Sequence, residues 1–492
     1  MKKIIILLPL FLTSISFSQQ LEGELKLKLN NKHDVFQIVD ETKKQVSLFF
    51  SDEESVKAYQ FNSEFKPIDS LLSNRPEGKF KSIIGYACKN NKYRIFWASN
   101  KNKEISSQCF DFESKKVSET LFKLNFSKEQ IIQQVTINNS FYIISLVKNS
   151  NVIKFYIFDN DGNLNTKIID AKNYTLMDSY SESVSLYDAF KEDFLPFEES
   201  FSLKSISPET PTSLTFAAFK RKIYTTPTEI IFTFDTNPQF TQLYKINLTD
   251  FSISRNLINQ PREGFPENDG SYSKENFGSK PEINSNSFII NDKIFQIKLC
   301  SKLIKISVKD LEGNEIKEFS AKPDQYIDFK NSEIIQENGS INNKRILDSS
   351  DQFIRKLYIS NPGITCFQKE GNYYLTIGSA SEIKEDASGA VIGGILFGAA
   401  GAIIVSLITA NQNIENFSSY QNRQIVYINS IFDSKLNHVS GDLKPLAFDQ
   451  LRSYAYEIKK STNLTIFKFN SFLYLGSYNK KTSSYSFNRF EE

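Results

Sequence analysis

Histidine is almost absent from this chain of 492 residues, which contains only His33 and His438, far apart in sequence. Ser-His-Asp and Cys-His catalytic groupings would need one of them, and neither lies in a recognisable nucleophile motif. Two histidines without paired cysteine spacing also exclude a zinc site. The sequence therefore predicts no catalytic residue, no metal site and no cofactor, and it favours a protein that is not an enzyme.

Cysteine is scarce too, with four residues in the chain: Cys88, Cys109, Cys300 and Cys366. Cys88 and Cys109 lie on second-neighbour strands of one predicted hairpin set, where strands are roughly 10 Å apart, too far for a disulfide. We expect four buried, unpaired thiols. The alternative is at least one disulfide, because exported chains can form them.

The chain lacks a strong net charge, because its 59 basic and 57 acidic residues leave a net charge of only +2. This balance gives no electrostatic basis for a nucleic-acid partner. The basic triplet Lys220-Arg221-Lys222 is interpreted as a solvated turn rather than a phosphate-binding patch.

The N-terminus has the features of a signal peptide spanning residues 1–18. Lys2 and Lys3 precede a short apolar stretch over residues 4–12, and Ser16-Phe17-Ser18 supplies a small-x-small cleavage pattern. No cysteine follows that would carry a lipid. We expect an exported chain, mature over residues 19–492 and located in the cell envelope, either periplasmic or membrane-associated.

Short apolar and aromatic strands separated by polar turns recur throughout the mature chain and predict an all-β fold. One hairpin-closing turn recurs with Asp or Asn after an apolar strand. Its copies are YQFNSEFKPID from Tyr59, QCFDFESKKVS from Gln108, YIFDNDGNLNT from Tyr156, YKINLTDFSIS from Tyr244, ISVKDLEGNEI from Ile306 and SIFDSKLNHVS from Ser430.

The first three copies, aligned on Phe61, Phe110 and Phe158, are spaced 49 and 48 residues apart. That spacing is typical of a four-stranded propeller blade, which takes roughly 40 to 50 residues. Adding terminal strands at 464–469, 472–478 and 483–490 predicts about seven blades. An N-terminal strand at 23–29 would complete the last blade and leave no free edge.

In period and hairpin pattern the chain resembles the β-propeller superfamily over nearly its whole mature length. The Trp-Asp dipeptide of WD40 repeats is missing, and the single Trp97 cannot serve every blade. The Gly-Gly pairs of kelch repeats are missing as well. Two packed β-sandwich domains are the alternative architecture.

A hydrophobic segment interrupts this pattern in a late blade. Residues 387–410 (ASGAVIGGILFGAAGAIIVSLITA) carry no charge and form the core of a predicted helical insert over residues 381–421. As one helix, this run would be about 36 Å long, enough to cross a bilayer. Small residues form a stripe that suits close helix packing; the stripe comprises Gly389, Ala390, Gly393, Gly394, Gly398, Ala402, Ser406 and Ala410.

The strands predicted at 373–379 and 424–432 flank this segment, and they would pair within one blade. If they pair, both ends of the segment lie on the same side of any membrane. A single crossing would then require the polar residues 411–422 to return through hydrocarbon, which is costly. The alternatives are a true span with unpaired flanks, a hairpin entering one leaflet, and a helix packed on the protein itself or on another subunit.

These features predict an exported, non-enzymatic binding or scaffold propeller, membrane-associated or self-associating through the hydrophobic segment. A protein or glycan ligand would bind on one of its faces. The alternative function is a propeller-type glycan hydrolase or lyase that uses carboxylates at the channel mouth. Fold alone does not decide between them, because propellers host both.

Overall fold

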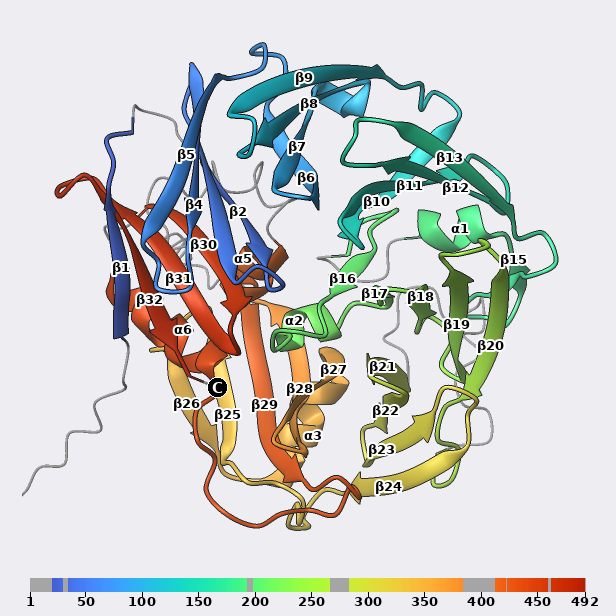
Figure 1. Cartoon of the computed structure of the whole chain (residues 1–492). Helices are drawn as coiled ribbons and strands as arrows, with labels where there is room; N and C mark the ends of the chain where they lie inside the picture. The colour runs from blue at the N-terminus through green and yellow to red at the C-terminus, as the bar shows by residue number, and fades with distance from the viewer. Residues whose placement is uncertain are drawn as a thin grey trace, which may run out of the picture.

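The computed structural model describes residues 20–29, 34–192, 198–265, 283–383, 412–421, 423–458 and 462–491. Within these residues, seven sheets of four or five strands follow one another around a ring (Figure 1). An all-β chain of such sheets fits a propeller-like fold, as the spacing of the hairpins predicted.

The first three sheets are antiparallel meanders in which each strand pairs with the next. Their strands are β2 (Asp34–Asp40), β3 (Gln45–Ser51), β4 (Ser55–Phe61) and β5 (Pro67–Asn74); β6 (Ser82–Lys89), β7 (Lys92–Ala98), β8 (Glu104–Asp111) and β9 (Lys116–Lys123); and β10 (Glu129–Ile137), β11 (Ser140–Val147), β12 (Val152–Phe158) and β13 (Leu164–Asp170). The first strand of each sheet lies nearest the axis and the last lies on the rim (Figure 1). Strands such as β3 and β7 are buried almost throughout because both faces of the sheet are covered, whereas the rim strands β5 and β9 alternate exposed and half-buried residues.

The fourth and fifth sheets repeat this plan with one addition at the inner edge. Here β16 (Lys204–Ile206) pairs in parallel with the first strand of the fourth sheet. The remaining strands are β17 (Arg221–Thr225), β18 (Glu229–Phe234), β19 (Phe240–Asn247) and β20 (Ile253–Asn259), then β21 (Asn284–Ile290), β22 (Lys293–Cys300), β23 (Leu303–Asp310) and β24 (Glu315–Ala321).

The sixth sheet is not assembled in chain order. Its strands are β25 (Ile334–Asn338), β26 (Lys344–Leu347), β27 (Asn361–Lys369), β28 (Asn372–Glu382) and β29 (Arg423–Phe432). The two earliest, β25 and β26, pair on the outer side of the latest, in the order β26-β25-β29-β28-β27. The rim strands of this sheet therefore precede its inner strands in the sequence.

The other elements are short and connect or cover the sheets. They are the 3-10 helix η1 (Asn100–Asn102), the hairpin of β14 (Leu176–Met177) and β15 (Ser183–Val184), and the helices α1 (Leu186–Lys191), α2 (Leu214–Ala217), α3 (Ser350–Tyr358), α5 (Gln412–Ser418) and α6 (Ala447–Glu457). Helix α3 begins with the Ser349 hydroxyl accepting from the Gln352 amide at 3.3 Å.

The recurring Asp or Asn has one local role in the six hairpin-closing turns. Its side-chain oxygen accepts hydrogen bonds from backbone amides two to four residues later, which fixes the turn; the acceptors are Asn62, Asp111, Asp159, Asn247, Asp310 and Asp433. In the last sheet, Asn479 accepts from Lys481 in the same way. A backbone hydrogen bond from Ser114, with further donors, lowers the pKa of Asp111 to about 2.

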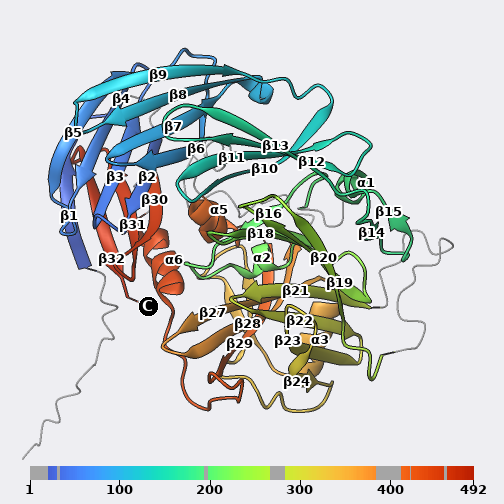
Figure 2. The same ribbon diagram turned by 45° about the vertical axis from the view of Figure 1, so that its right-hand side comes forward.

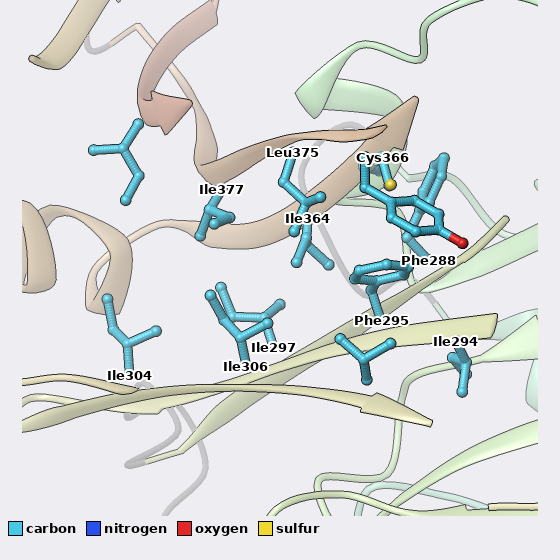
Figure 3. Close-up of a cluster of buried hydrophobic side chains, with 14 of the residues drawn as sticks. Phe288, Ile294, Phe295, Ile297, Ile304, Ile306, Ile364, Cys366, Leu375 and Ile377 are labelled. Atoms are coloured by element: carbon cyan, nitrogen blue, oxygen red, sulfur yellow. The ribbon is translucent and has the colours of Figure 1, made fainter. Parts of the chain in front are cut away.

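The core lies between neighbouring sheets rather than at one centre. Figure 3 shows the cluster shared by the fifth and sixth sheets, where Phe295 and Ile306 face Ile364 and Leu375. These four side chains are at most 1% exposed. Because each sheet buries both faces in this way, the stability of one sheet depends on the presence of the next.

The ring closes where the two ends of the chain meet. The last sheet contains β30 (Thr462–Phe469), β31 (Phe472–Asn479) and β32 (Ser484–Phe490), and β1 (Gln20–Lys26) adds to its rim, antiparallel to β32. The strand begins three residues earlier than the predicted 23–29. The first and last sheets then pack through aromatic pairs, with ring centroids of Phe61 and Phe487 5.1 Å apart.

The four cysteines are unpaired, as expected from their spacing. Cys88 and Cys109 lie on β6 and β8, which are second neighbours in one sheet. Cys366 is buried as well, and Cys300 is partly exposed. Burial raises the pKa of the Cys88 thiol to about 12, so this side chain behaves as an inert apolar group.

Removal of β1 tests the closure of the ring. A chain that begins after Lys26 loses the strand that pairs with β32 and the buried side chain of Leu25. We expect the free energy of unfolding to fall by about 3 kcal/mol or more. We also expect self-association to increase through the exposed edge of β32. Chemical denaturation and light scattering measure both effects. A matched chain beginning at Gln20 keeps the strand, and equal stability of the two would contradict this closure.

Candidate functional site at the axis of the ring

Three short elements lie inside the ring: β16, α2 and α5 (Figures 1 and 2). We call residues 204–217 and 412–418, which contain them, the axial plug. They come from two segments far apart in the chain, one joined to the fourth sheet and one directly following the hydrophobic segment. The plug covers inner strands that would otherwise present unpaired edges to the axis.

Hydrogen bonds join the two segments of the plug. The Asn416 side chain accepts from the Ser213 amide at 2.7 Å and donates to the Pro211 carbonyl at 2.8 Å. The Tyr420 hydroxyl accepts from the Leu214 amide at 2.9 Å. Asn416 is only 7% exposed, and both groups of its amide are satisfied, so α5 is held in one register against residues 211–214.

An ion pair closes the plug at its polar side. Lys204, at the start of β16, donates to the carboxylate of Glu415 on α5. Its ammonium also lies 4.3 Å from the ring centroid of Phe216 and 4.8 Å from that of Phe219. The positive charge is therefore neutralised and covered by aromatic faces.

Two glycines allow α2 to pack closely on the sixth sheet. Gly363 and Gly378 are cross-strand partners on β27 and β28. A Cβ atom at Gly363 would lie 3.0 Å from the Ala218 amide nitrogen and 3.2 Å from Leu214 Cδ1. Only a residue without a side chain leaves room for the plug at this distance.

The basic triplet 220–222 lies beside the plug and is buried, so its interpretation as a solvated turn is wrong. Lys222 is 0% exposed and donates to Asp235 Oδ2 at 2.9 Å and to Asn286 Oδ1 at 2.7 Å. Arg221, also 0% exposed, pairs with Glu198 Oε1 at 3.0 Å. The acidic partners are distant in sequence from their bases, so the triplet alone could not reveal them.

Lys220 occupies the same region: its backbone amide donates to Glu198 Oε2 at 2.7 Å, but among the described residues no carboxylate accepts from its ammonium. Its ammonium donates to Asn284 Oδ1 at 2.8 Å and to the Ser285 carbonyl. Burial lowers the pKa of Lys220 from 10.5 to about 8. The charged form is therefore less stable here than in water.

Another buried ion pair links the sixth sheet to α6. Glu337 Oε2 accepts from Arg452 Nη2 at 2.7 Å, and Tyr427 donates to Glu337 Oε1 at 2.8 Å. The Arg452 guanidinium carbon lies 4.2 Å from the ring centroid of Tyr420. Tyr420, which follows α5, also accepts a hydrogen bond from the Leu214 amide. The ion pair between Glu337 and Arg452 therefore helps to hold the plug against the sixth sheet.

The residues predicted to contact a membrane or pack with a helix lie outside the described residues. They are Gly389, Ala390, Gly393, Gly394, Gly398, Ala402, Ser406 and Ala410. Their flanks are described: Ser381 and Glu382 end β28, and α5 begins at Gln412. Among the described residues, no helix has the length and apolar character needed to cross a membrane.

The flanking strands pair as the sequence predicted. The register of β28 with β29 runs from Tyr373 opposite Phe432 to Glu382 opposite Arg423. The chain thus leaves the sheet and returns to it at neighbouring positions.

Of the two histidines, the structure describes His438, which is not part of the plug. His33 lies outside the described residues, and His438 is partly buried, with its Nε2 3.0 Å from Asn331 Oδ1 and its ring against Phe432. Within the described part of the chain, no three His, Cys, Asp or Glu side chains are grouped so that they could hold a metal ion.

A cavity of about 540 Å³ lies beside β10, between the second and third sheets. Residues 129–134 of β10 line it, polar except for Ile131 and Ile132, together with Asn102 of η1 and Phe126. A smaller cavity of about 130 Å³ shares Gln133 and Gln134 with it and reaches Lys204, Phe216 and Glu415 of the plug. The signal for this site in the sequence is the run of glutamines in β10, which hairpin spacing alone did not distinguish.

No family model and no curated relative matches the chain. Among solved structures it is similar to the WD40 domain of SCAP from fission yeast, with 11% identity over 96% of this chain and 98% of that chain, at a TM-score of 0.33. It also aligns with a mutant of AofleA from Arthrobotrys oligospora, with 12% identity over 74% of this chain and 84% of that one, at a TM-score of 0.23.

A third alignment is with a mutant of the apocarotenoid oxygenase of Synechocystis, at 6% identity over 56% of this chain and a TM-score of 0.27. The match spans 58% of that oxygenase's length. These scores are too low to carry an argument, so the description of the fold rests on the sheets themselves.

The packing of the plug is tested by Gly363→Ala. Its Cβ would meet Ala218 and Leu214, so we expect α2 to be displaced and stability to fall by about 1 to 3 kcal/mol. Denaturant unfolding measures the loss. Gly78→Ala is the matched control, because its Cβ would meet nothing within 4 Å. A Gly363→Ala protein as stable as this control would contradict the close packing.

The buried Lys220 gives a dependence of stability on pH. Its pKa is lower in the folded chain (about 8) than the ordinary value of 10.5, so the unfolded chain binds more protons between these two values. Raising the pH from about 8 to 10.5 therefore favours folding through this group. We expect wild type to gain stability relative to Lys220→Met over that range, whereas its difference from Lys128→Met stays flat. A flat difference for both would contradict the shift.

Proposed function

We propose that this chain is an exported, non-enzymatic binding module whose ring is attached to a membrane by residues 387–410. We also propose that its seven sheets are the blades of one closed propeller, with the hydrophobic segment inserted in the sixth. The signal-peptide pattern and the uncharged, Gly- and Ala-rich composition of the segment support this proposal from the sequence.

The pairing of β28 with β29 carries the proposal. Their register continues to Glu382 opposite Arg423, so the chain leaves the sixth sheet before the segment and rejoins it after α5 at neighbouring positions. A single crossing would leave the returning chain in hydrocarbon with unsatisfied backbone groups. A hairpin that turns near 398–401 has two arms of about ten residues, or about 15 Å each, which matches one leaflet.

The axial plug explains how such a segment would be held rigidly relative to the ring. Directly after it, α5 is fixed to residues 211–214 by Asn416 and to β16 by Glu415. On its other side, the segment continues from the paired end of β28. Movement of the segment at the membrane would therefore be transmitted to the axis rather than absorbed by a loose linker.

The alternative, a glycan hydrolase or lyase, needs free carboxylates at the channel mouth. Four buried carboxylates are instead engaged by cations: Glu129 by Lys154, Glu198 by Arg221, Asp235 by Lys222 and Glu337 by Arg452. A carboxylate neutralised in this way is a poor general base.

Fractionation of the native host tests membrane attachment. We compare the full-length protein with a variant in which residues 387–410 are replaced by an equal length of Gly and Ser, leaving β28 and α5 intact. After alkaline and high-salt washes, the full-length protein should remain with the membranes and the replacement variant should be released. Retention of both, with the variant's thermal unfolding unchanged, would contradict attachment through this segment.

A second variant separates lipid insertion from association with another subunit. Gly394→Leu with Gly398→Leu keeps the run apolar but removes two small residues of the packing stripe. Attachment by lipid insertion predicts that this variant stays with the washed membranes. Its release would instead assign the segment to packing against a partner helix.

A further inference from the structure

We propose that the cavity beside β10 binds a neutral carbohydrate of one or two sugar rings. This site deepens the proposed binding function and rests on it, but it does not involve residues 387–410. Its volume of about 540 Å³ lies within the usual range for small-ligand sites, about 300 to 1,000 Å³.

Glutamines of β10 lie along the cavity on both sides of a bulge. The register with β11 shifts between Ile131 and Gln133, so β10 carries one extra residue there. Gln130 precedes this irregularity, whereas Gln133 and Gln134 follow it in regular pairing with β11. All three glutamines line this cavity, and Gln133 and Gln134 also line the smaller one beside the plug.

The two glutamines differ in their hydrogen bonds. Gln133 is fixed, because its Nε2 donates to the Leu203 carbonyl at 2.8 Å and its Oε1 accepts from the Gln134 amide at 2.8 Å. The side-chain nitrogen of Gln134 is buried and makes no hydrogen bond within the described part of the chain. An unsatisfied buried amide is unfavourable, so a rotation of the Gln134 side chain that brings this nitrogen to the cavity would let a ligand oxygen accept from it favourably.

The carboxylate in the wall does not give the cavity a net charge. Glu129 is 7% exposed and accepts from Lys154 at 2.6 Å, from Ser145 at 2.6 Å and from Tyr156 at 3.0 Å. Its charge is balanced by Lys154, and its oxygens are already occupied. The cavity therefore suits a neutral ligand and gives no advantage to an anion or a cation.

The remaining wall has the two kinds of group that bind sugars. Amide side chains both donate and accept, so they can pair with neighbouring hydroxyl groups of one ring. Phe126 supplies an apolar surface, and its ring is held edge-to-face against Tyr156 with centroids 5.2 Å apart. Together these features recognise a molecule that is rich in hydroxyls, uncharged and apolar on one face.

Calorimetry on the purified full-length protein tests the site. The probes are glucose, galactose, N-acetylglucosamine, maltose and cellobiose, each at concentrations up to about 10 mM, since a Kd near 1 mM is weak binding. We expect at least one to bind and to raise the unfolding temperature. Absence of heat and of stabilisation with every sugar would overturn this site while leaving membrane attachment untouched.

Two substitutions locate the binding. Gln134→Ala and Gln134→Glu both remove the amide donors, so each should weaken sugar binding about tenfold, the worth of roughly one hydrogen bond. The exposed Gln325→Ala is the matched control and should bind as wild type does. Equal binding by all three would overturn the assignment to this cavity. If the Gln134 variants do not fold, Gln130→Ala, on the same wall, takes their place with the same expectation.

Discussion

The pairing of β1 with β32 is the constraint on which the rest of the ring depends. It joins the two ends of the chain in one sheet and lets the first and last sheets pack through their aromatic rings. Every sheet then has a neighbour on each face, so hydrophobic burial is continuous around the ring. Without this pairing, the edge of β32 would be open to water, and the cluster between the first and last sheets would lose the buried side chain of Leu25.

Closure of the ring creates an interior that the protein must fill. Here the axial plug occupies it, and the polar groups that enter with the plug are paired: Asn416 with backbone groups, and Lys204 with Glu415 and two aromatic rings. Arg221 and Lys222 lie beside the plug as ion pairs in which both partners are buried. Such pairs add little net stability, but they strongly disfavour any packing that would leave one charge alone. The Lys222–Asp235 pair also hydrogen-bonds Asn286 and Ser287 of β21, so it helps to specify how the fourth and fifth sheets meet.

Local patterns allowed much of the ring to be predicted from the sequence. The turn residues from Asn62 to Asp433 act within a few residues of their own position, so the hairpins they close could be recognised directly. The N-terminal strand of the last sheet could be predicted because the free edge of a sheet must be covered. The pairing of β28 with β29 could be predicted because strands that follow one another in the chain usually pair.

Long-range partners could not be predicted in the same way. Glu198 and Asp235 neutralise Arg221 and Lys222 of the basic triplet, which the sequence alone predicts to be solvated. The parallel addition of β16, the return of β25 to the rim of the sixth sheet, and the plug each depend on contacts between distant segments. Hydrophobic periodicity reports which face of a strand is buried, but not what covers it. The cavity beside β10 was not predicted, because hairpin spacing identifies a strand but not which of its side chains line a pocket.

Depth-dependent fluorescence quenching tests the central claim, attachment of the ring through residues 387–410, most directly. The only tryptophan, Trp97, is 0% exposed within the second sheet and serves as an internal reference that lipid cannot reach. A Phe397→Trp protein is mixed with vesicles whose lipids carry bromine at defined acyl positions. We expect the brominated lipids to quench the new tryptophan and to leave the fluorescence of the wild-type protein unchanged. Equal, minimal quenching of both proteins would contradict the account.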